Sequence, residues 1–320
     1  MLHEIVIQKN DAGQRLDKFI LKYLPSMPKN LLYKLIRQKD IKYNQKRCTG
    51  KEILQEGDTL RIYAKEEFFL TSKEKKPVRK ELRAGTLRIL FEDHNFILIH
   101  KPAGQDMHSS NRKKIPALTE IMQAYLIQKG EYHPEQEQSF SPAFCNRIDR
   151  NTEGIVIAAK NAAALRNMNE AIRNREVRKQ YLAIVSRPLP ERHQICKAWL
   201  KKNADSNQVQ IASFQKDSAW LEIITEYAVL AQNGRKQLVL VTLHTGRTHQ
   251  IRAHLAFLGS PLLGDSKYGD SSETEKYQCL CAYSLDFSAV TSPELTYLRE
   301  QQIKTAVPDF AEKYFPDINL

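Results

Sequence analysis

The chain of 320 residues has no uninterrupted apolar stretch of the ~18 residues that a membrane-spanning helix needs. Its first residues, MLHEIVIQKNDAGQ, also lack the apolar centre of a secretory signal peptide. Only five cysteines are present, and the closest pair is Cys279 and Cys281, so neither a disulfide framework nor a structural zinc spacing is found. We therefore expect a protein of a reducing compartment, the cytoplasm, without membrane association.

Loops that bind nucleotide cofactors are missing as well. Neither a Walker loop nor a GxGxxG occurs, and HTGRTHQ, residues 244–250, contains a single glycine. No internal repeat is evident. We expect a protein that works without a bound nucleotide.

Positive charge is in excess and is unevenly placed. Lysine and arginine number 49 against 37 aspartates and glutamates, a formal charge of +12. Residues 1–80 hold 19 basic and 10 acidic side chains, a net of +9, which leaves +3 for the other 240 residues. A small basic module before a nearly balanced larger one is the arrangement expected of an RNA-binding appendage on an enzyme.

The basic module has the patterns of two helices and several short strands. Apolar residues recur at helical spacing through residues 12–25 and stop at Pro25. A second helix follows, with Ser26 as a candidate N-cap and Pro28 near its first turn. Its polar face is either an ordinary solvated surface or a phosphate-binding one. The candidate RNA-binding residues on this helix and its exit loop are Lys29, Lys34, Arg37, Lys39, Lys42, Lys46 and Arg47.

Three fragments of this module, RLDKFI, IKYN and GDTLRIY, occur in the order found in S-four-like RNA-binding domains. The chain resembles such a domain over about residues 14–63, which implies that the basic helix docks on structured RNA. The charge-dense residues 66–85 have little periodicity and are expected to form a linker. We therefore predict an RNA-binding domain at 1–65, a linker at 66–85 and a catalytic domain at 86–320.

From residue 86 onward, strand patterns dominate. Residues 86–104 give two apolar segments around Asp93, as in a hairpin, and GIVIAAK is typical of a buried strand. THQIRAHLAFLG, residues 248–259, has helical spacing and a closing Gly259. Many strands with few helices favour an α+β fold with a mixed, mainly antiparallel sheet over a βαβ repeat.

The segment CNRIDRNTEGIVIAAKN, residues 145–161, holds one acidic group, Asp149, between two arginines and directly before an apolar run. An aspartate in this position is most often a turn residue that bonds its own backbone. Downstream, LHTGRTHQIRAHL contains Arg247 and Arg252, whose guanidinium groups suit phosphate or a carboxylate such as Asp149.

Three histidines in the same segment raise the possibility of a metal site. Ligands on one helix face stand three or four residues apart, whereas His249 and His254 differ by five, and no cysteine or carboxylate joins them. We expect His244, His249 and His254 to support the loop, and we expect no metal.

A longer set of motifs then makes the resemblance specific. NFILIHKPAGQDMH, NRIDRNTEGIVIAAK, RKQYLAIV, HTGRTHQIRAHLAFLGSPLLGDSKYG and LCAYSLDF occur in the order found in the RluA family of RNA pseudouridine synthases. The chain is similar to that family over about residues 86–310. With the S-four-like domain in front, it resembles the ribosomal large-subunit members.

The resemblance implies the roles of the site residues. Asp149 falls on the catalytic aspartate, and Arg247 on the arginine that pairs with it and keeps it charged. Tyr181, which by itself has the pattern of a core strand aromatic, falls on a tyrosine that stacks on the target base and assists removal of the proton from carbon 5. The candidate substrate-binding residues are Arg147, beside the flipped-out nucleotide, and Arg150, Lys101 and Arg252, for which solvated or phosphate-facing positions are the alternative.

Four residues depart from the common family pattern. The usual HRLD and TSG are replaced at Asn146, Ile148 and Glu153, and Cys281 stands where LHA is usual. Isoleucine for leucine preserves volume. We expect the change at Asn146 to alter local contacts and the added negative charge of Glu153 to affect RNA docking.

We conclude that the sequence predicts a monomeric, cofactor-free RNA pseudouridine synthase acting on structured RNA, with ribosomal RNA as its expected partner. One alternative is a non-catalytic ribosomal-RNA-binding or assembly factor on the same fold. Another is a metal hydrolase built on the histidines, which a chelator would inhibit.

Overall fold

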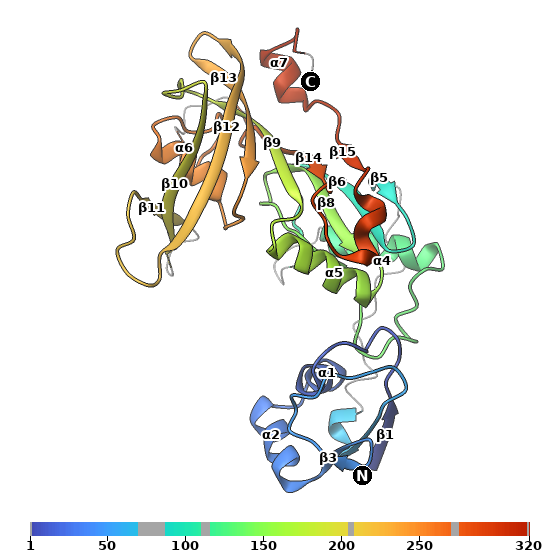
Figure 1. Ribbon diagram of the computed structural model, residues 1–320. Helices are drawn as coiled ribbons and strands as arrows, with labels where there is room; N and C mark the ends of the chain where they lie inside the picture. Colours follow the sequence, from blue (N-terminus) through green and yellow to red (C-terminus); the bar gives the residue numbers. More distant parts are fainter. Residues whose placement is uncertain (1, 70–86, 110–115, 204–207, 270–274, 319) are drawn as a thin grey trace. The chain divides into compact units, whose positions relative to one another are not determined.

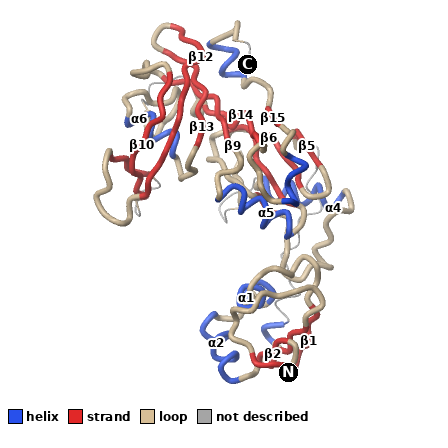
Figure 2. The backbone as a smooth tube through the Cα atoms, in the orientation of Figure 1, coloured by secondary structure: helices blue, strands red, loops and turns tan. Residues whose placement is uncertain are grey.

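The computed structural model describes residues 2–69, 87–109, 116–203, 208–269, 275–318 and 320 (Figures 1 and 2). Its chain divides into two compact units. The first comprises Met1–Gly85 together with Glu120–Ala143 and Ala159–Arg166, and the second comprises Thr86–Thr119, Phe144–Ala158 and Asn167–Leu320. Helices α4 (Leu118–Gln128) and α5 (Ala162–Arg173) each include residues of both units.

The first unit contains a four-stranded antiparallel sheet in the order β1-β4-β2-β3 and two helices. Its elements are β1 (Leu2–Val6), α1 (Leu16–Tyr23), α2 (Lys29–Gln38), β2 (Ile41–Tyr43), β3 (Lys46–Arg47) and β4 (Thr59–Tyr63). The two predicted helices and the short strands of the basic module are thereby confirmed.

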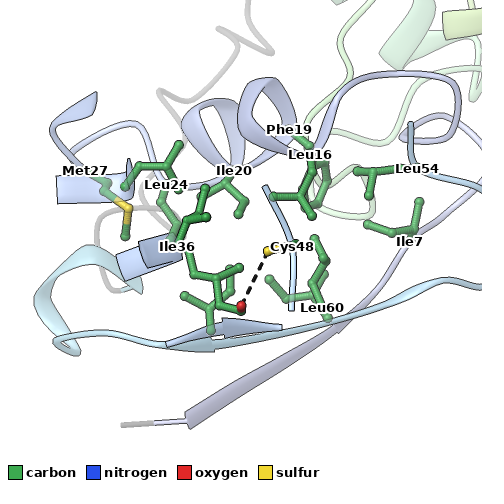
Figure 3. Close-up of a cluster of buried hydrophobic side chains, with 14 of the residues drawn as sticks. Ile7, Leu16, Phe19, Ile20, Leu24, Met27, Ile36, Cys48, Leu54 and Leu60 are labelled. Carbon is green, nitrogen blue, oxygen red and sulfur yellow. Dashed lines mark hydrogen bonds between the residues drawn. The ribbon is translucent and has the colours of Figure 1, made fainter. Parts of the chain in front are cut away.

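The core of this unit follows from helical spacing. Helix α1 buries Leu16, Phe19 and Ile20, three residues that lie on one face because they stand three or four positions apart (Figure 3). Helix α2 buries Leu32 and Ile36 in the same way. Burying these side chains removes apolar surface from water and holds both helices on the sheet.

Helix α2 begins differently from the prediction. Pro28 is its N-cap, with extended backbone (φ −65°, ψ 138°), so Lys29 is the first helical residue and Ser26 does not cap it. No side chain bonds the first turn from the cap position. The helix ends at Gln38, and its C-cap Lys39, with a left-handed φ of 69°, turns the chain into β2.

Phe69 lies in the predicted linker but belongs to the core of the first unit. It is 5% exposed, and its ring stacks on His3 with centroids 3.5 Å apart. The remainder of the predicted linker, residues 70–85, lies outside the described residues. The boundaries at 65 and 85 remain predictions.

The second unit contains most of a sheet that has 11 strands among the described residues. The order is β11-β10-β12-β13-β9-β14-β8-β6-β5, with β15 beside β14 and β7 beside β8. Of the pairings with a defined register, only β14–β8 is parallel in the part of the chain that the structure describes. The strands are β5 (Arg88–Glu92), β6 (Phe96–Lys101), β7 (Ala143–Phe144), β8 (Glu153–Ala159), β9 (Arg178–Val185), β10 (His193–Lys202), β11 (Val209–Ala212), β12 (Leu221–Asn233), β13 (Lys236–Leu243), β14 (Leu280–Asp286) and β15 (Gln302–Lys304).

Two helices and a 3-10 turn complete this unit: α6 (Gln250–Phe257), η1 (Pro293–Leu298) and α7 (Asp309–Tyr314). The predicted hairpin around Asp93 is confirmed, because the Asp93 carboxylate accepts bonds from the backbone N–H groups of Asn95 and Phe96 between β5 and β6. The predicted α+β class with a mixed, mainly antiparallel sheet is confirmed.

Gly154 fixes the place where the sheet meets the functional loop. It is the second residue of β8 and has a left-handed φ of +112°, and a Cβ there would lie 2.3 Å from the backbone oxygen of Ala282 in β14. Only glycine allows this approach between two parallel strands. The turn that carries Asp149 is therefore anchored directly against the sheet.

Among the helices of the described chain, none combines the length and the apolar character that crossing a bilayer requires.

Candidate active site

A cavity of about 300 Å³ lies in the second unit. Its walls come from the turn before β8, from β9 and the end of β13, and from the loop that leads into α6. The charged and hydroxyl-bearing side chains that line it include Arg147, Asp149, Lys179, Tyr181, Arg247 and Arg252. The structure thus brings together the predicted catalytic residues Asp149, Tyr181 and Arg247 from three separate segments of the chain.

Asp149 occupies a tight turn, but its carboxylate does not serve that turn. The turn is closed by the backbone, since the N–H of Thr152 donates to the carbonyl of Asp149 at 3.1 Å. The carboxylate, with 25% of the side chain exposed, faces the cavity and accepts a hydrogen bond from Arg252. The simple turn explanation of this aspartate is therefore incomplete.

A single guanidinium joins two carboxylates. Nη1 of Arg252 donates to Oδ2 of Asp149 at 2.9 Å, while Nε and Nη2 donate to the two oxygens of Asp265, each at 2.8 Å. Asp265 is fully buried and also accepts bonds from the backbone N–H groups of Lys267 and Tyr268. This arrangement fixes the orientation of Arg252, and with it one oxygen of Asp149.

The electrostatics favour the charged form of this group. Burial opposes the charge on Arg252, but its hydrogen bonds and charge contacts with Asp265 and then Asp149 outweigh burial and raise its pKa. Burial likewise acts to raise the pKa of Asp265, but the bonds from Arg252 and the backbone lower it overall. The negative charge of Asp265 therefore compensates the positive charge of Arg252 inside the protein.

The predicted pairing of Arg247 with Asp149 is wrong. Arg247 lines the cavity with an exposed side chain, and among the described residues it forms no ion pair. Arg252, a predicted substrate-binding residue, is 7% exposed and forms the pair instead. The reason is positional, because Arg252 lies inside α6, whereas Arg247 precedes the helix in an open loop.

Tyr181 lies on β9, where it pairs with Val241 of β13 and Ala282 of β14. Its side chain is 8% exposed and lines the cavity. Burial, and then the negative charge of Asp149, raise the pKa of Tyr181 well above its ordinary value. The hydroxyl therefore keeps its proton at physiological pH.

The other predicted substrate-binding residues differ in their exposure. Arg147 is exposed and lines the cavity. Lys101 is fully buried, and its ammonium donates to the carbonyls of Pro102, Gln105 and Arg150 at 3.0, 3.1 and 2.7 Å. A substrate-binding role for Lys101 is contradicted, because the side chain holds two loops together and does not reach solvent.

Arg150 is exposed but lies outside the cavity lining. Its Nε donates to the carbonyl of Gly104 at 3.0 Å and lies 3.7 Å from a carboxylate oxygen of Asp106.

Burial lowers the pKa of Lys101 to about 8, although the negative charges of Asp149 and other nearby acids act to raise it.

The three histidines have three separate partners. His244 pairs with Glu226 at 2.8 Å, and the buried His254 lies 2.9 Å from the hydroxyl of Thr225. His249 lies 3.8 Å from Asp149 and contacts the hydroxyl of Tyr268 at 2.9 Å. Within the described part of the chain, no group of three or more histidine, cysteine or acidic side chains is arranged to hold a metal ion.

The departures from the family pattern are accommodated locally. The Asn146 side-chain oxygen accepts a hydrogen bond from the backbone N–H of Ile157 at 2.8 Å, so it fastens the loop to β8. Glu153 lies 3.7 Å from His100, and Cys281 is fully buried. Burial raises the pKa of the Cys281 thiol well above its ordinary value, so the thiol is inert.

The basic side chains of the first unit are available for binding. Six of the seven predicted RNA-binding residues are exposed, and the seventh, Lys42, is half-buried. None of the seven forms an ion pair with another described residue. Their role in binding RNA remains a prediction.

Sequence reasoning assigned no role to Asp265, Lys179 or Tyr268. The sequence could have indicated Asp265, because it is an acid at the end of the apolar run SPLLG, and a buried acid is almost always paired with a cation. It could also have indicated Lys179, because this lysine stands two residues before Tyr181 in a predicted strand and so lies on the same face. For Tyr268 we find no comparable signal.

Comparison with known proteins bears on this site. Residues 95–257 match the family described as RNA pseudouridylate synthase, and residues 14–60 match the S4 domain. An uncharacterized RNA pseudouridine synthase of Mycoplasma capricolum is 29% identical over 309 residues, 94% of this chain and 96% of that protein. The ribosomal large subunit pseudouridine synthase C of Haemophilus influenzae is 32% identical over 269 residues, 83% of this chain and 79% of that protein.

Solved structures share the fold. The human RNA pseudouridylate synthase domain-containing proteins 4 and 1 match with TM-scores of 0.57 and 0.55, each at 22% identity. The matches cover 72% and 71% of this chain and 94% and 84% of the two human chains.

Proposed function

This chain belongs to the RNA pseudouridylate synthase family and is an RNA pseudouridine synthase, and we propose that it isomerises specific uridines of large-subunit ribosomal RNA with Asp149 as the catalytic carboxylate. The choice of RNA rests on relatives such as the Haemophilus influenzae protein, which is named for the ribosomal large subunit. The basic surface of the first unit supports an RNA of defined structure as the substrate.

One observation carries the assignment of Asp149. Arg252 holds Oδ2 of this residue from inside the protein, and among the described residues no group bonds the other oxygen, Oδ1. A carboxylate that is fixed on one side and open to a cavity on the other is preorganised to meet a reacting atom. Asp265 is bound on all sides and has no such opening.

The reaction needs only groups that this chain supplies. The bond from N1 of uracil to C1′ of ribose breaks, a bond from C5 to C1′ forms, and a proton passes from C5 to N1. Asp149 serves either as a nucleophile toward ribose or base, or as a negative charge beside the ribose cation that develops as the bond breaks. Atoms and electrons balance without a redox partner or a group donor.

Access to the bond requires the uridine to leave the helical stack. Neither C5 nor the glycosidic bond is exposed to remodelling inside a duplex, so the base must flip into the cavity. There it meets the ring of Tyr181, which offers a stacking surface, and the protonated hydroxyl, which donates a hydrogen bond as the proton leaves C5. Arg147, exposed at the cavity, is placed to contact the RNA around the flipped nucleotide.

The experiment is pseudouridine mapping of ribosomal RNA by carbodiimide-dependent reverse-transcription stops. Cells lacking the gene are compared with cells that carry the intact gene, Asp149→Asn or Asp309→Asn. The last variant is the matched control, because Asp309 is an exposed aspartate on α7 that does not line the cavity.

We expect at least one site to disappear on deletion and to return with the intact gene and with Asp309→Asn, but not with Asp149→Asn. Purified Asp149→Asn should bind the same RNA with unchanged affinity, because the substitution removes one charge and no phosphate contact. If every ribosomal site persists without the gene, the large-subunit assignment is wrong. If Asp149→Asn restores the site, a different group performs the chemistry.

A further inference from the structure

Lys179 lines the same cavity and has no role in the reaction described above. It stands two residues before Tyr181 on β9, so both side chains project from the same face of the strand. Opposite them on β13, Leu243 pairs with Lys179 and Val241 pairs with Tyr181. Lys179 and Tyr181 therefore line the same wall of the cavity, with Lys179 nearer the end of β13.

The ammonium of Lys179 holds no other described polar group in place. Its side chain is half-buried, yet within the described residues it has neither a hydrogen bond nor an ion pair. Burial alone lowers its pKa, and no neighbouring acid offsets that effect. A partly desolvated charge without a partner is costly, and such groups concentrate where a ligand supplies the partner.

The surroundings of Lys179 indicate an anion as that partner. Its Nζ lies 3.8 Å from the position that a Cβ on Gly246 would take, and Gly246, Arg247 and Thr248 form an exposed edge of the cavity. Arg247 and Arg147 also line the cavity without ion pairs among the described residues. This part of the cavity is thus cationic, while the carboxylate of Asp149 is already held by Arg252.

We propose that the ammonium of Lys179 binds a backbone phosphate directly adjoining the uridine that is isomerised, an inference that rests on the proposed function. With the base against Tyr181 and the ribose at Asp149, the phosphates on either side are the fixed anions of that nucleotide. Lysine binds phosphate as a point charge and needs no particular plane of approach. The contact offsets part of the cost of unstacking the base.

The test compares Lys179→Met, Lys179→Arg and Lys236→Met on transcribed large-subunit ribosomal RNA. Methionine keeps the length of the side chain and removes the charge, whereas arginine keeps the charge. Lys236 is the matched control: it is a half-buried lysine at the opposite end of β13, beside the ring of Tyr314 and outside the cavity lining. Pseudouridine formation and RNA binding are measured for each protein.

For Lys179→Met we expect kcat/KM to fall about tenfold or more, mainly through KM, because a phosphate contact is present in the ground state and the transition state alike. The slope of log Kd against log salt should decrease in magnitude by roughly 0.7–0.9, the value for one phosphate contact. Lys179→Arg should retain activity within about threefold, and Lys236→Met should match the unmodified protein. Unchanged binding and unchanged kcat/KM in Lys179→Met would overturn the proposal.

A second arm identifies the anion. Short RNAs that contain the mapped uridine carry a neutral methylphosphonate in place of one adjoining phosphate at a time. For one position, the intact enzyme should lose about as much kcat/KM as Lys179→Met loses on ordinary RNA, and Lys179→Met should lose nothing further. If the losses add at every position, Lys179 contacts another group, such as a uracil carbonyl, and the phosphate assignment is wrong.

The two proposals fail in different ways. If the intact protein forms no pseudouridine in large-subunit ribosomal RNA, the proposed function fails and this inference falls with it. If the intact protein forms pseudouridine and Lys179→Met is equally active, only the role of Lys179 is wrong.

Discussion

Nη1 of Arg252 lies 2.9 Å from Oδ2 of Asp149, and the same guanidinium holds both oxygens of the buried Asp265. The position of the proposed catalytic carboxylate is thus set from the interior of the protein and does not depend on the exposed groups at the cavity edge. Arg247, at the rim, is free to meet RNA.

This relationship predicts opposite results for two arginines in one motif. Arg252→Lys should lower the single-turnover rate constant by about 100-fold or more, because an ammonium cannot bond two carboxylates in the fork geometry of a guanidinium. Arg247→Gln should leave kcat nearly unchanged and raise KM, because it removes an exposed cation. Rapid-quench pseudouridine assays measure both. Equal losses of kcat in the two variants would restore Arg247 as a catalytic residue.

Asp265→Asn should damage both stability and catalysis. The substitution leaves Arg252 with an incomplete partner in a buried site, which costs about 3–5 kcal/mol when one member of a buried ion pair is removed. Urea unfolding measures the loss, with Asp309→Asn as the exposed control. A variant of normal stability and normal kcat would show that Asp149 alone suffices to orient Arg252.

Tyr181 allows the ring to be separated from the hydroxyl. Tyr181→Phe keeps the stacking surface and should retain RNA affinity while kcat falls about 100-fold, because the hydrogen bond that the hydroxyl donates as the proton leaves C5 is lost. Tyr181→Leu should lose affinity as well. Because burial and Asp149 raise the pKa of Tyr181, kcat of the intact enzyme should show no ionisation of this tyrosine up to about pH 10. A Phe variant with full activity would assign the residue to stacking alone.

His254 should make the fold sensitive to mild acid. Burial lowers its pKa to about 4 from an ordinary value of 6.5, so the unfolded chain binds the proton first as pH falls. Its contribution to the free energy of unfolding is therefore constant above about pH 7 and decreases by roughly 2 kcal/mol by pH 5. Urea unfolding at about pH 7.5 and pH 5 should show a smaller loss in His254→Asn. An equal loss in both proteins would place the sensitivity elsewhere.

The basic helix of the first unit should supply affinity without chemistry. Replacing Lys34, Arg37 and Lys39 together by glutamine should weaken RNA binding and lower the magnitude of the salt slope by up to about 2–3, with kcat unchanged at saturating RNA. The buried face of α2, Leu32 and Ile36, is untouched, so the unit should stay folded. Arginine at 34 and 39 is the charge-preserving control and should bind normally. An unchanged salt slope in the glutamine variant would remove this surface from the RNA interface.

Local patterns predicted the elements well where one face of an element is buried. Leu16, Phe19 and Ile20 stand at helical spacing because α1 is covered on one side only. The same argument fails for α6, whose residues from Gln250 to Leu255 are all buried, so no polar face separates one arginine position from another. The resemblance therefore pointed to Arg247 as the partner of Asp149, five residues before Arg252 and outside the helix.

The order of motifs in the sequence determined the family, the α+β class, and Asp149 and Tyr181 as candidates, because those features depend on residue identity and local spacing. Tertiary structure alone decided which cation reaches Asp149 and that Lys101 is enclosed among backbone carbonyls. It also decided that Lys179 lines the cavity without an ion pair to any residue that the structure describes. Each of these arrangements depends on strands and loops that are distant along the chain and that only folding brings together. The identity of a charged residue does not reveal whether folding leaves it in water, pairs it or buries it. Those surroundings determine its pKa and therefore its reactivity.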